Sequence, residues 1–107
     1  MERCVVVFVT CPSLKSAKQL AQHVVKARVA ACVNILPEIR SLFRWQGKVD
    51  QAKETLLLIK TTARRFPALK RHILRSHPYD VPEVIALPVV AAHRPYTTWV
   101  AQSVRGA

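Results

Sequence analysis

A chain of 107 residues, half of them apolar and only two of them glycine, has the size and composition of a single folded domain, which we expect to span residues 1–107. No apolar run is long enough for an export signal or a membrane span, and the three cysteines contain no CxxC pair, so we expect a cytoplasmic protein with reduced thiols. The net charge of +11, from 17 basic and 6 acidic residues, favours anionic partners.

The first half of the chain predicts a strand, a helix and an interrupted strand. The strand covers Cys4–Thr10, which is rich in valine and closed by a proline. Ser13 is a suitable cap for a helix whose apolar residues recur at helical spacing, with lysines on the opposite face. A second strand starts at Ala31–Ile35, is interrupted at Pro37 and resumes over Ile39–Trp45.

The second half completes a hairpin and repeats the helix and strand pattern. A turn containing Gly47 leads into a strand from about Val49 to Thr61. A helix over Arg64–Ser76, a strand over Val84–Val90 and a short closing helix around residues 96–104 follow. The order β-α-β-β-α-β predicts an α+β fold of the ferredoxin-like type, with a long hairpin between the second and third strands.

The hairpin is long for a domain of this size. A strand of about 12 residues spans roughly 40 Å, which exceeds the expected diameter of the domain, so the tip of the hairpin extends beyond its own core. Phe43 and Trp45 place aromatic side chains on this extension. We therefore expect a homo-oligomer in which a second copy of the chain covers Phe43 and Trp45.

Four blocks of sequence, in this order, resemble the CutA family of divalent-cation tolerance proteins. They are Val29-Ala30-Ala31-Cys32-Val33-Asn34, Ser41-Leu42-Phe43-Arg44-Trp45-Gln46-Gly47-Lys48, Leu57-Leu58-Ile59-Lys60-Thr61 and His77-Pro78-Tyr79-Asp80-Val81-Pro82-Glu83. The resemblance runs from about Val5 to Val100. It implies a ferredoxin-like subunit in a tight homotrimer, a role in tolerance to copper and other divalent cations, and no catalysis.

The resemblance also suggests a metal site formed by Cys11, His77 and Glu83. Copper-binding relatives use a strand cysteine with the histidine and glutamate of the last block; this chain has Val9 at the position of that cysteine and a thiol two residues later. Antiparallel pairing of the first and fourth strands brings these segments together. Thiolate, imidazole and carboxylate groups suit copper or another divalent cation. The alternative is that His77 caps the preceding helix and hydrogen-bonds locally.

A cleft between subunits is a second candidate site, formed by Trp45, Lys60 and Tyr79. We expect the third strand to run parallel to the first, which brings Lys60 and Thr61 to the same end of the sheet as Cys11. Such a cleft suits a small anion or an aromatic ligand. The competing interpretation of Trp45 is that it is a buried anchor of the interface.

The sequence gives little support to catalysis, and it leaves one other binding class open. It contains no Ser/His/Asp arrangement, no paired carboxylates and no glycine-rich phosphate loop, so we expect a protein that is not an enzyme. No acidic residue lies between Glu54 and Asp80, and the helix over residues 64–75 is strongly basic. Non-specific nucleic-acid binding by that helix is the alternative function.

Overall fold

The computed structural model describes residues 3–105, so the two outermost residues at each end of the predicted domain lie outside the described part. The elements follow the predicted order: β1 (Cys4–Cys11), α1 (Leu14–Lys26), β2 (Cys32–Trp45), β3 (Lys48–Thr62), α2 (Phe66–Ser76), β4 (Val84–Pro88) and α3 (Arg94–Ser103). The described helices do not combine the length and apolar character that crossing a membrane requires.

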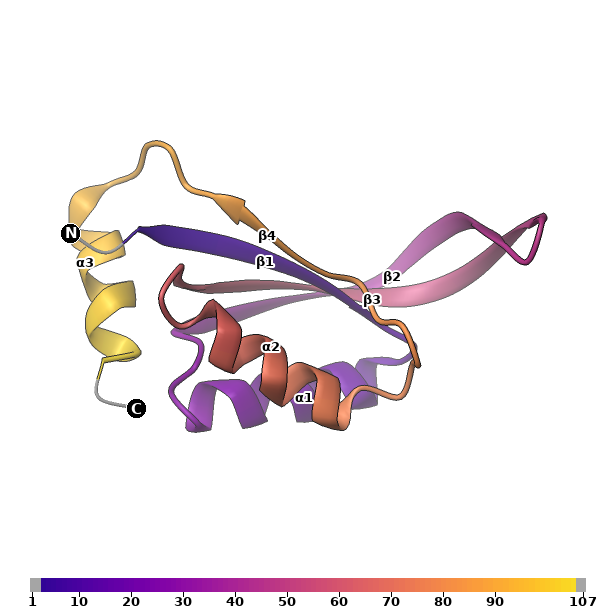
Figure 1. Ribbon diagram of the computed structural model, residues 1–107, viewed down its shortest axis with the longest axis horizontal. Helices are drawn as coiled ribbons and strands as arrows, with labels where there is room; N and C mark the ends of the chain where they lie inside the picture. Colours follow the sequence, from indigo (N-terminus) through magenta and orange to yellow (C-terminus); the bar gives the residue numbers. More distant parts are fainter. Residues whose placement is uncertain (1–2, 106–107) are drawn as a thin grey trace.

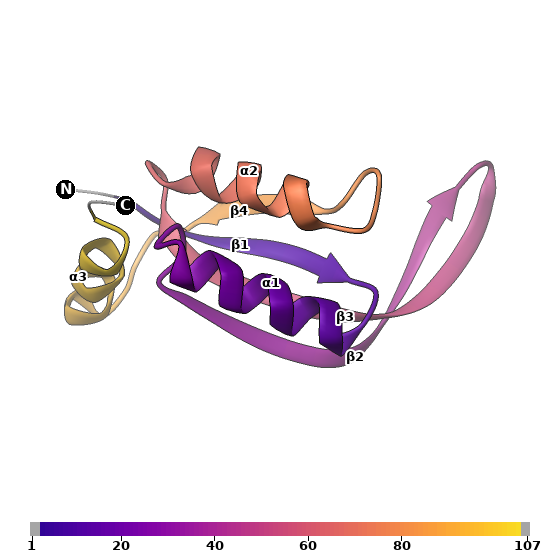
Figure 2. The ribbon, with the colours of Figure 1, turned by 90° about the horizontal axis from the view of Figure 1, so that it is seen from below.

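The four strands form one sheet in the order β2-β3-β1-β4, and α1 and α2 cover the same face of it (Figures 1 and 2). This confirms the ferredoxin-like α+β arrangement. Every neighbouring pair is antiparallel, so the expectation that β3 runs parallel to β1 is wrong. The α1 crossover returns β2 in the direction of β1, and the hairpin then reverses the chain, so β3 must run against β1.

The core lies between the helices and one face of the sheet. In β1 the side chains of Val5, Val7 and Val9 are buried because successive strand residues point to opposite faces. The helices contribute apolar side chains at helical spacing, and the fully buried members are Ala17, Val24, Leu69 and Ile73. As predicted, Ser13 caps α1, because its Oγ accepts a hydrogen bond of 3.1 Å from the Ser16 amide.

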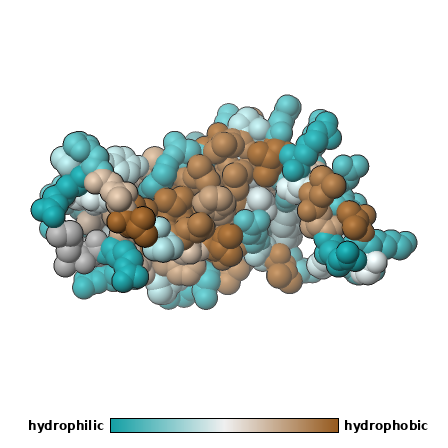
Figure 3. Space-filling view, turned by 90° about the horizontal axis from the view of Figure 1, so that it is seen from above, coloured by the Kyte–Doolittle hydropathy of each residue, from teal (hydrophilic) through white to brown (hydrophobic). Residues whose placement is uncertain are grey.

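The opposite face of the sheet is apolar and is covered by neither α1 nor α2. Figure 3 shows hydrophobic side chains gathered over the middle of this face. Phe8 and Leu58 are partners in the register of β1 and β3 and lie on it, because their neighbours along each strand point into the core. In β4, Ile85 and Leu87 are 51% and 43% exposed.

The β2–β3 hairpin leaves the sheet and forms an arm at one end of the molecule (Figure 1). The interruption predicted at Pro37 is a β-bulge inside one continuous strand, because the register shifts between Leu36 and Ile39. At the tip, Gln46 and Gly47 have φ values of 50° and 79°, the two positive angles of a tight hairpin turn. The arm makes the molecule 44 Å long and only 26 Å by 21 Å across.

Candidate functional site

The candidate site lies where β1 ends, beside the segment that connects α2 to β4. Val9 pairs with Val84, and Nε2 of His77 lies 2.8 Å from the carbonyl oxygen of Thr10. These contacts confirm that the end of the first strand meets the segment from His77 to Glu83.

Both ring nitrogens of His77 have hydrogen-bond partners within the protein. The Tyr79 amide donates to Nδ1 at 3.1 Å, so Nδ1 carries no proton and Nε2 donates to the Thr10 carbonyl. The backbone amide of His77 also closes α2 by donating to the Ile73 carbonyl. His77 therefore ends α2 and forms hydrogen bonds with nearby backbone groups. This is the interpretation of His77 that the sequence suggested as the alternative to metal binding.

Tyr79 connects this segment to the middle of the hairpin. Its hydroxyl donates a hydrogen bond of 2.8 Å to Oε2 of Glu54, whose side chain is only 8% exposed. Burial, the hydrogen bond to Glu54 and the negative charge of Glu54 raise the pKa of Tyr79 to about 12. The tyrosine is thus a hydrogen-bond donor at neutral pH, and it holds a buried carboxylate in place.

Cys11 lies beside this pair and is buried. Its side chain is 1% exposed, and burial, followed by the nearby charge of Glu54, raises the pKa of the thiol to about 11. Metals bind the thiolate, so the protonated thiol of Cys11 is a poor ligand at neutral pH.

The three predicted metal ligands do not form a site within one subunit. Among residues 3–105, no three histidine, cysteine, aspartate or glutamate side chains gather closely enough to hold a metal ion. Cys11 is enclosed in the core, both nitrogens of His77 are engaged, and Glu83 lies on the exposed surface. The separation follows from the pleat of β1, which turns Cys11 toward the helices.

A cavity of about 940 Å³ lies in the angle between the hairpin arm and the segment that precedes β4. Trp45, Tyr79 and Glu83 all line it. Lys60 does not line it within one subunit, and its expected position at the same end of the sheet as Cys11 is wrong, because antiparallel pairing sets it opposite Val6, near the start of β1. Thr61 is likewise at that end, and its hydroxyl donates to the Val29 carbonyl at 2.8 Å.

The cavity wall is acidic although the protein is basic. Four of the six acidic residues of the chain line it, and Arg40 is the one basic residue among the lining side chains. The carboxylates are those of Asp50, Glu54, Asp80 and Glu83. We refer to this space as the acidic cavity. It can attract a cation or a ligand with a positively charged group.

The role of Glu54 as the partner of Tyr79 was not predicted from the sequence. The available signal was its position directly before the apolar run of the third strand, in a chain with few acidic residues. A carboxylate in such a place needs a hydrogen-bond donor, and Tyr79 supplies it.

Residues 5–103 match the model of a protein family described as CutA1 divalent ion tolerance protein. The divalent-cation tolerance protein CutA of Thermus thermophilus is 46% identical over 98 residues, which cover 92% of this chain and 95% of that protein. Protein CutA of Mus musculus is 50% identical over 95 residues, or 89% of this chain. This match covers 54% of the mouse protein, so the chain spans about half the length of that relative.

Solved structures show the same fold. The crystal structure of CutA1 from Oryza sativa is 42% identical and superposes with a TM-score of 0.95, covering 99% of this chain and 97% of that one. The divalent cation tolerance protein from Thermus thermophilus is 45% identical, with a TM-score of 0.92 over 94% of this chain and 97% of that one. The fold described above is therefore the fold of these proteins.

Proposed function

Because the chain belongs to the CutA1 divalent ion tolerance family, we propose that it is a homotrimeric, non-catalytic protein that binds divalent cations in the acidic cavity. The observation that carries this proposal is the gathering of four carboxylates in one cavity of a chain whose net charge is +11. A random distribution of six acidic residues would leave most of them on other surfaces. The concentrated negative charge attracts cations to this end of the molecule.

The donor set indicates which groups hold the ion. Carboxylate oxygens suit hard divalent cations, and they also bind copper and zinc as part of a mixed site. The thiol of Cys11 is protonated at neutral pH, and both nitrogens of His77 are engaged. We therefore assign cation binding to the carboxylates of Asp50, Asp80 and Glu83, and we expect copper to compete with other divalent cations.

A second and third copy of the chain complete the proposed site. The carboxylates of a single subunit line the cavity without converging, and the hairpin arm beside them exposes Leu42, Phe43 and Trp45. The apolar sheet face around Phe8 and Leu58 is a second exposed surface of the kind that protein interfaces bury (Figure 3). Trimer formation buries both surfaces and brings further ligands toward the cavity.

Other features of the protein agree with this proposal. Cys11 and Cys32 form no disulfide, which is consistent with the reducing cytoplasm that we propose as its location. The Thermus thermophilus relative is named for divalent-cation tolerance, and none of the relatives reported above is named as an enzyme or as a nucleic-acid-binding protein. The nucleic-acid alternative therefore has no support.

The test is calorimetric titration of the purified trimer with Mn²⁺ and with Cu²⁺. The double variant Asp50→Asn/Glu83→Gln should weaken binding at least about tenfold, which corresponds to roughly 1.4 kcal/mol. For single substitutions, Glu83→Gln should weaken binding and Glu38→Gln should not. Both remove one exposed carboxylate, but Glu38 does not line the acidic cavity. Equal losses in these two variants, or no binding by the unmodified trimer, would contradict the proposal.

A further inference from the structure

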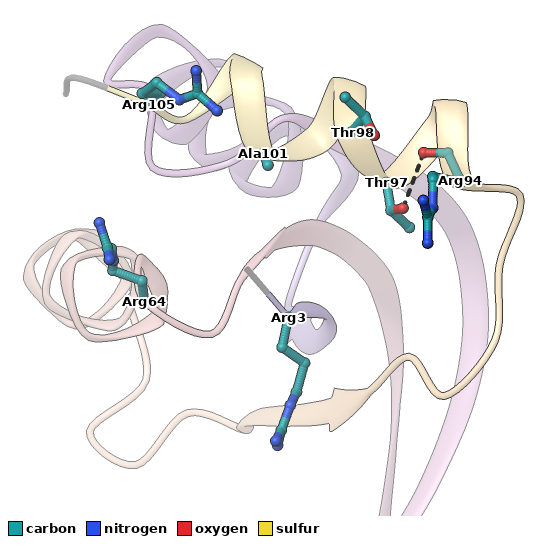
Figure 4. Close-up of a pocket in the computed structure, with 7 residues that line it drawn as sticks. All are labelled: Arg3, Arg64, Arg94, Thr97, Thr98, Ala101 and Arg105. Carbon is teal, nitrogen blue, oxygen red and sulfur yellow. Dashed lines mark hydrogen bonds between the residues drawn. The ribbon is translucent and has the colours of Figure 1, made fainter. Parts of the chain in front are cut away.

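A second cavity, of about 640 Å³, lies at the other end of the sheet. Four arginines from four different places in the chain line it: Arg3 precedes β1, Arg64 precedes α2, Arg94 begins α3, and Arg105 follows α3. Thr97, Thr98 and Ala101 form the wall that α3 contributes (Figure 4). We refer to this space as the arginine cavity.

No acidic residue of the described chain lines the arginine cavity. The described acidic residues all lie between Glu38 and Glu83, on or beside the hairpin and the segment before β4. Thr10 lines the acidic cavity, and Arg3 lies seven residues earlier, which is about 23 Å along an extended chain. The two cavities, one lined by carboxylates and the other by arginines, thus lie at opposite ends of the sheet.

Four positively charged side chains line one cavity and repel one another, and no acidic side chain in its described wall offsets that repulsion. Arginine keeps its charge at every physiological pH and presents a planar group that binds phosphate oxygens in pairs. A bound anion would offset the repulsion between the arginines and accept hydrogen bonds from their N–H groups. The cavity volume is within the range of sites that hold small ligands.

We propose that the arginine cavity binds a small oligophosphate, meaning a ligand with several linked phosphate groups such as tripolyphosphate or a nucleoside triphosphate. Each linked phosphate carries at least one negative charge, so a chain of three balances most of the charge of the four arginines. The proposal is independent of the cation site, which is formed by other residues at the other end of the sheet.

The spacing of the arginines favours an extended anion over a single phosphate. Arg94 begins α3 and Arg105 follows its end, and a helix of ten residues is about 15 Å long. In Figure 4, Arg94 extends from α3 toward the strands, while Arg64 points from the opposite wall toward α3. A single orthophosphate reaches few of these groups at once, whereas a phosphate chain reaches several.

The experiment is a calorimetric titration of the trimer with tripolyphosphate, ATP and orthophosphate at low salt, with a chelator present so that no metal bridges the ligand to the protein. Tripolyphosphate should bind at least about tenfold more tightly than orthophosphate, and Arg94→Gln/Arg105→Gln should weaken its binding at least about tenfold. The matched control is Arg71→Gln/Arg75→Gln, which removes the same charge from α2 outside the cavity and should change the affinity less than about twofold.

A third variant, Thr98→Glu, keeps all four arginines and places a carboxylate in the wall that α3 contributes; it should abolish binding. Equal affinity for ATP and tripolyphosphate would identify the phosphate chain as the recognised group, and tighter binding of ATP would identify the ligand as a nucleotide. The proposal is overturned if tripolyphosphate does not bind, if the cavity and control variants lose affinity equally, or if duplex DNA competes as strongly as tripolyphosphate per phosphate.

Discussion

Nε2 of His23 lies 2.8 Å from Nδ1 of His72, so one imidazole donates a hydrogen bond to the other and joins α1 to α2. The ring centroids are 4.9 Å apart. The pair needs at least one neutral ring, because two imidazolium ions have no acceptor to offer each other. Burial first, and then the charges of His23, Arg75, Arg71 and Arg65, lower the pKa of His72 below 6.5.

We predict that the protein loses stability when His72 is protonated. A lowered pKa in the folded state means that the unfolded chain binds this proton more tightly. The contribution of the pair is therefore complete above pH 6.5 and is lost as the pH falls through the lowered pKa of His72. The midpoint of thermal unfolding should decrease as the pH falls below about 6.5.

The control for this prediction is a comparison of His72→Asn with His93→Asn. The first variant removes the titrating ring, so its unfolding midpoint should depend less on pH; the second removes an exposed histidine outside the pair and should keep the parental dependence. Identical pH profiles for the two variants would refute the role of His72.

We predict a coupling between Tyr79 and Glu54 that a double-mutant cycle can measure. Tyr79→Phe leaves the buried carboxylate without its donor, which should cost about 1–3 kcal/mol of unfolding free energy at pH 7. After Glu54→Gln, the same tyrosine substitution should cost less, because no charge remains to be stabilised. Additive effects in chemical denaturation would show that the 2.8 Å hydrogen bond contributes nothing.

We predict that Cys11→Ser lowers stability but leaves cation affinity unchanged. The hydroxyl would enter a core position that is 1% exposed, at a cost of about 1–3 kcal/mol, and the thiol that it replaces is protonated at neutral pH. The partly exposed Cys32 is the matched position, and Cys32→Ser should be milder. A loss of copper affinity in Cys11→Ser without loss of stability would restore the thiol as a ligand.

We predict that Trp45→Ala weakens the trimer. In a single subunit the indole is 55% exposed on the arm, and truncating an aromatic anchor of an interface typically costs about 2 kcal/mol or more. Sedimentation over a range of concentrations should show dissociation at a higher concentration than for the parent. Leu74→Ala, at an α2 position that is 52% exposed, should leave the mass unchanged. If the parent protein is a monomer, Trp45 is not an anchor of a trimer interface and the prediction is wrong.

The sequence predicted the elements because their signals are local. A valine-rich run, a serine cap and a glycine turn each act within a few residues, and the structure confirms the elements that they predict. The position of Lys60 was wrong because it depended on strand direction, which is a property of the whole chain path. His77 was ambiguous because only the orientation of its ring decides whether a nitrogen remains available.

The charge of each cavity could not be predicted, because each cavity is formed by segments distant in sequence. The acidic cavity depends on the path of the arm after the bulge at Leu36–Ile39, which brings Asp50 and Glu83 to one space. The sequence suggested the basic helix over residues 64–75 as an anion-binding element, but only Arg64 of that range lines the arginine cavity. The sequence predicted Phe43 and Trp45 as interface residues. It did not predict the apolar face of the sheet, because the register of β1 and β3 determines which side chains lie on that face.

The central place of β1 also determines when the protein can fold during synthesis. β1 is made first, but its two partners arrive late, since Cys4 pairs with Thr62 and Val5 pairs with Pro88. A ribosome that adds 5–20 residues per second needs about 4–15 s to advance from Cys11 to Pro88. During that interval a valine-rich strand is without its neighbours, so the newly made chain is more prone to aggregation than the completed sheet.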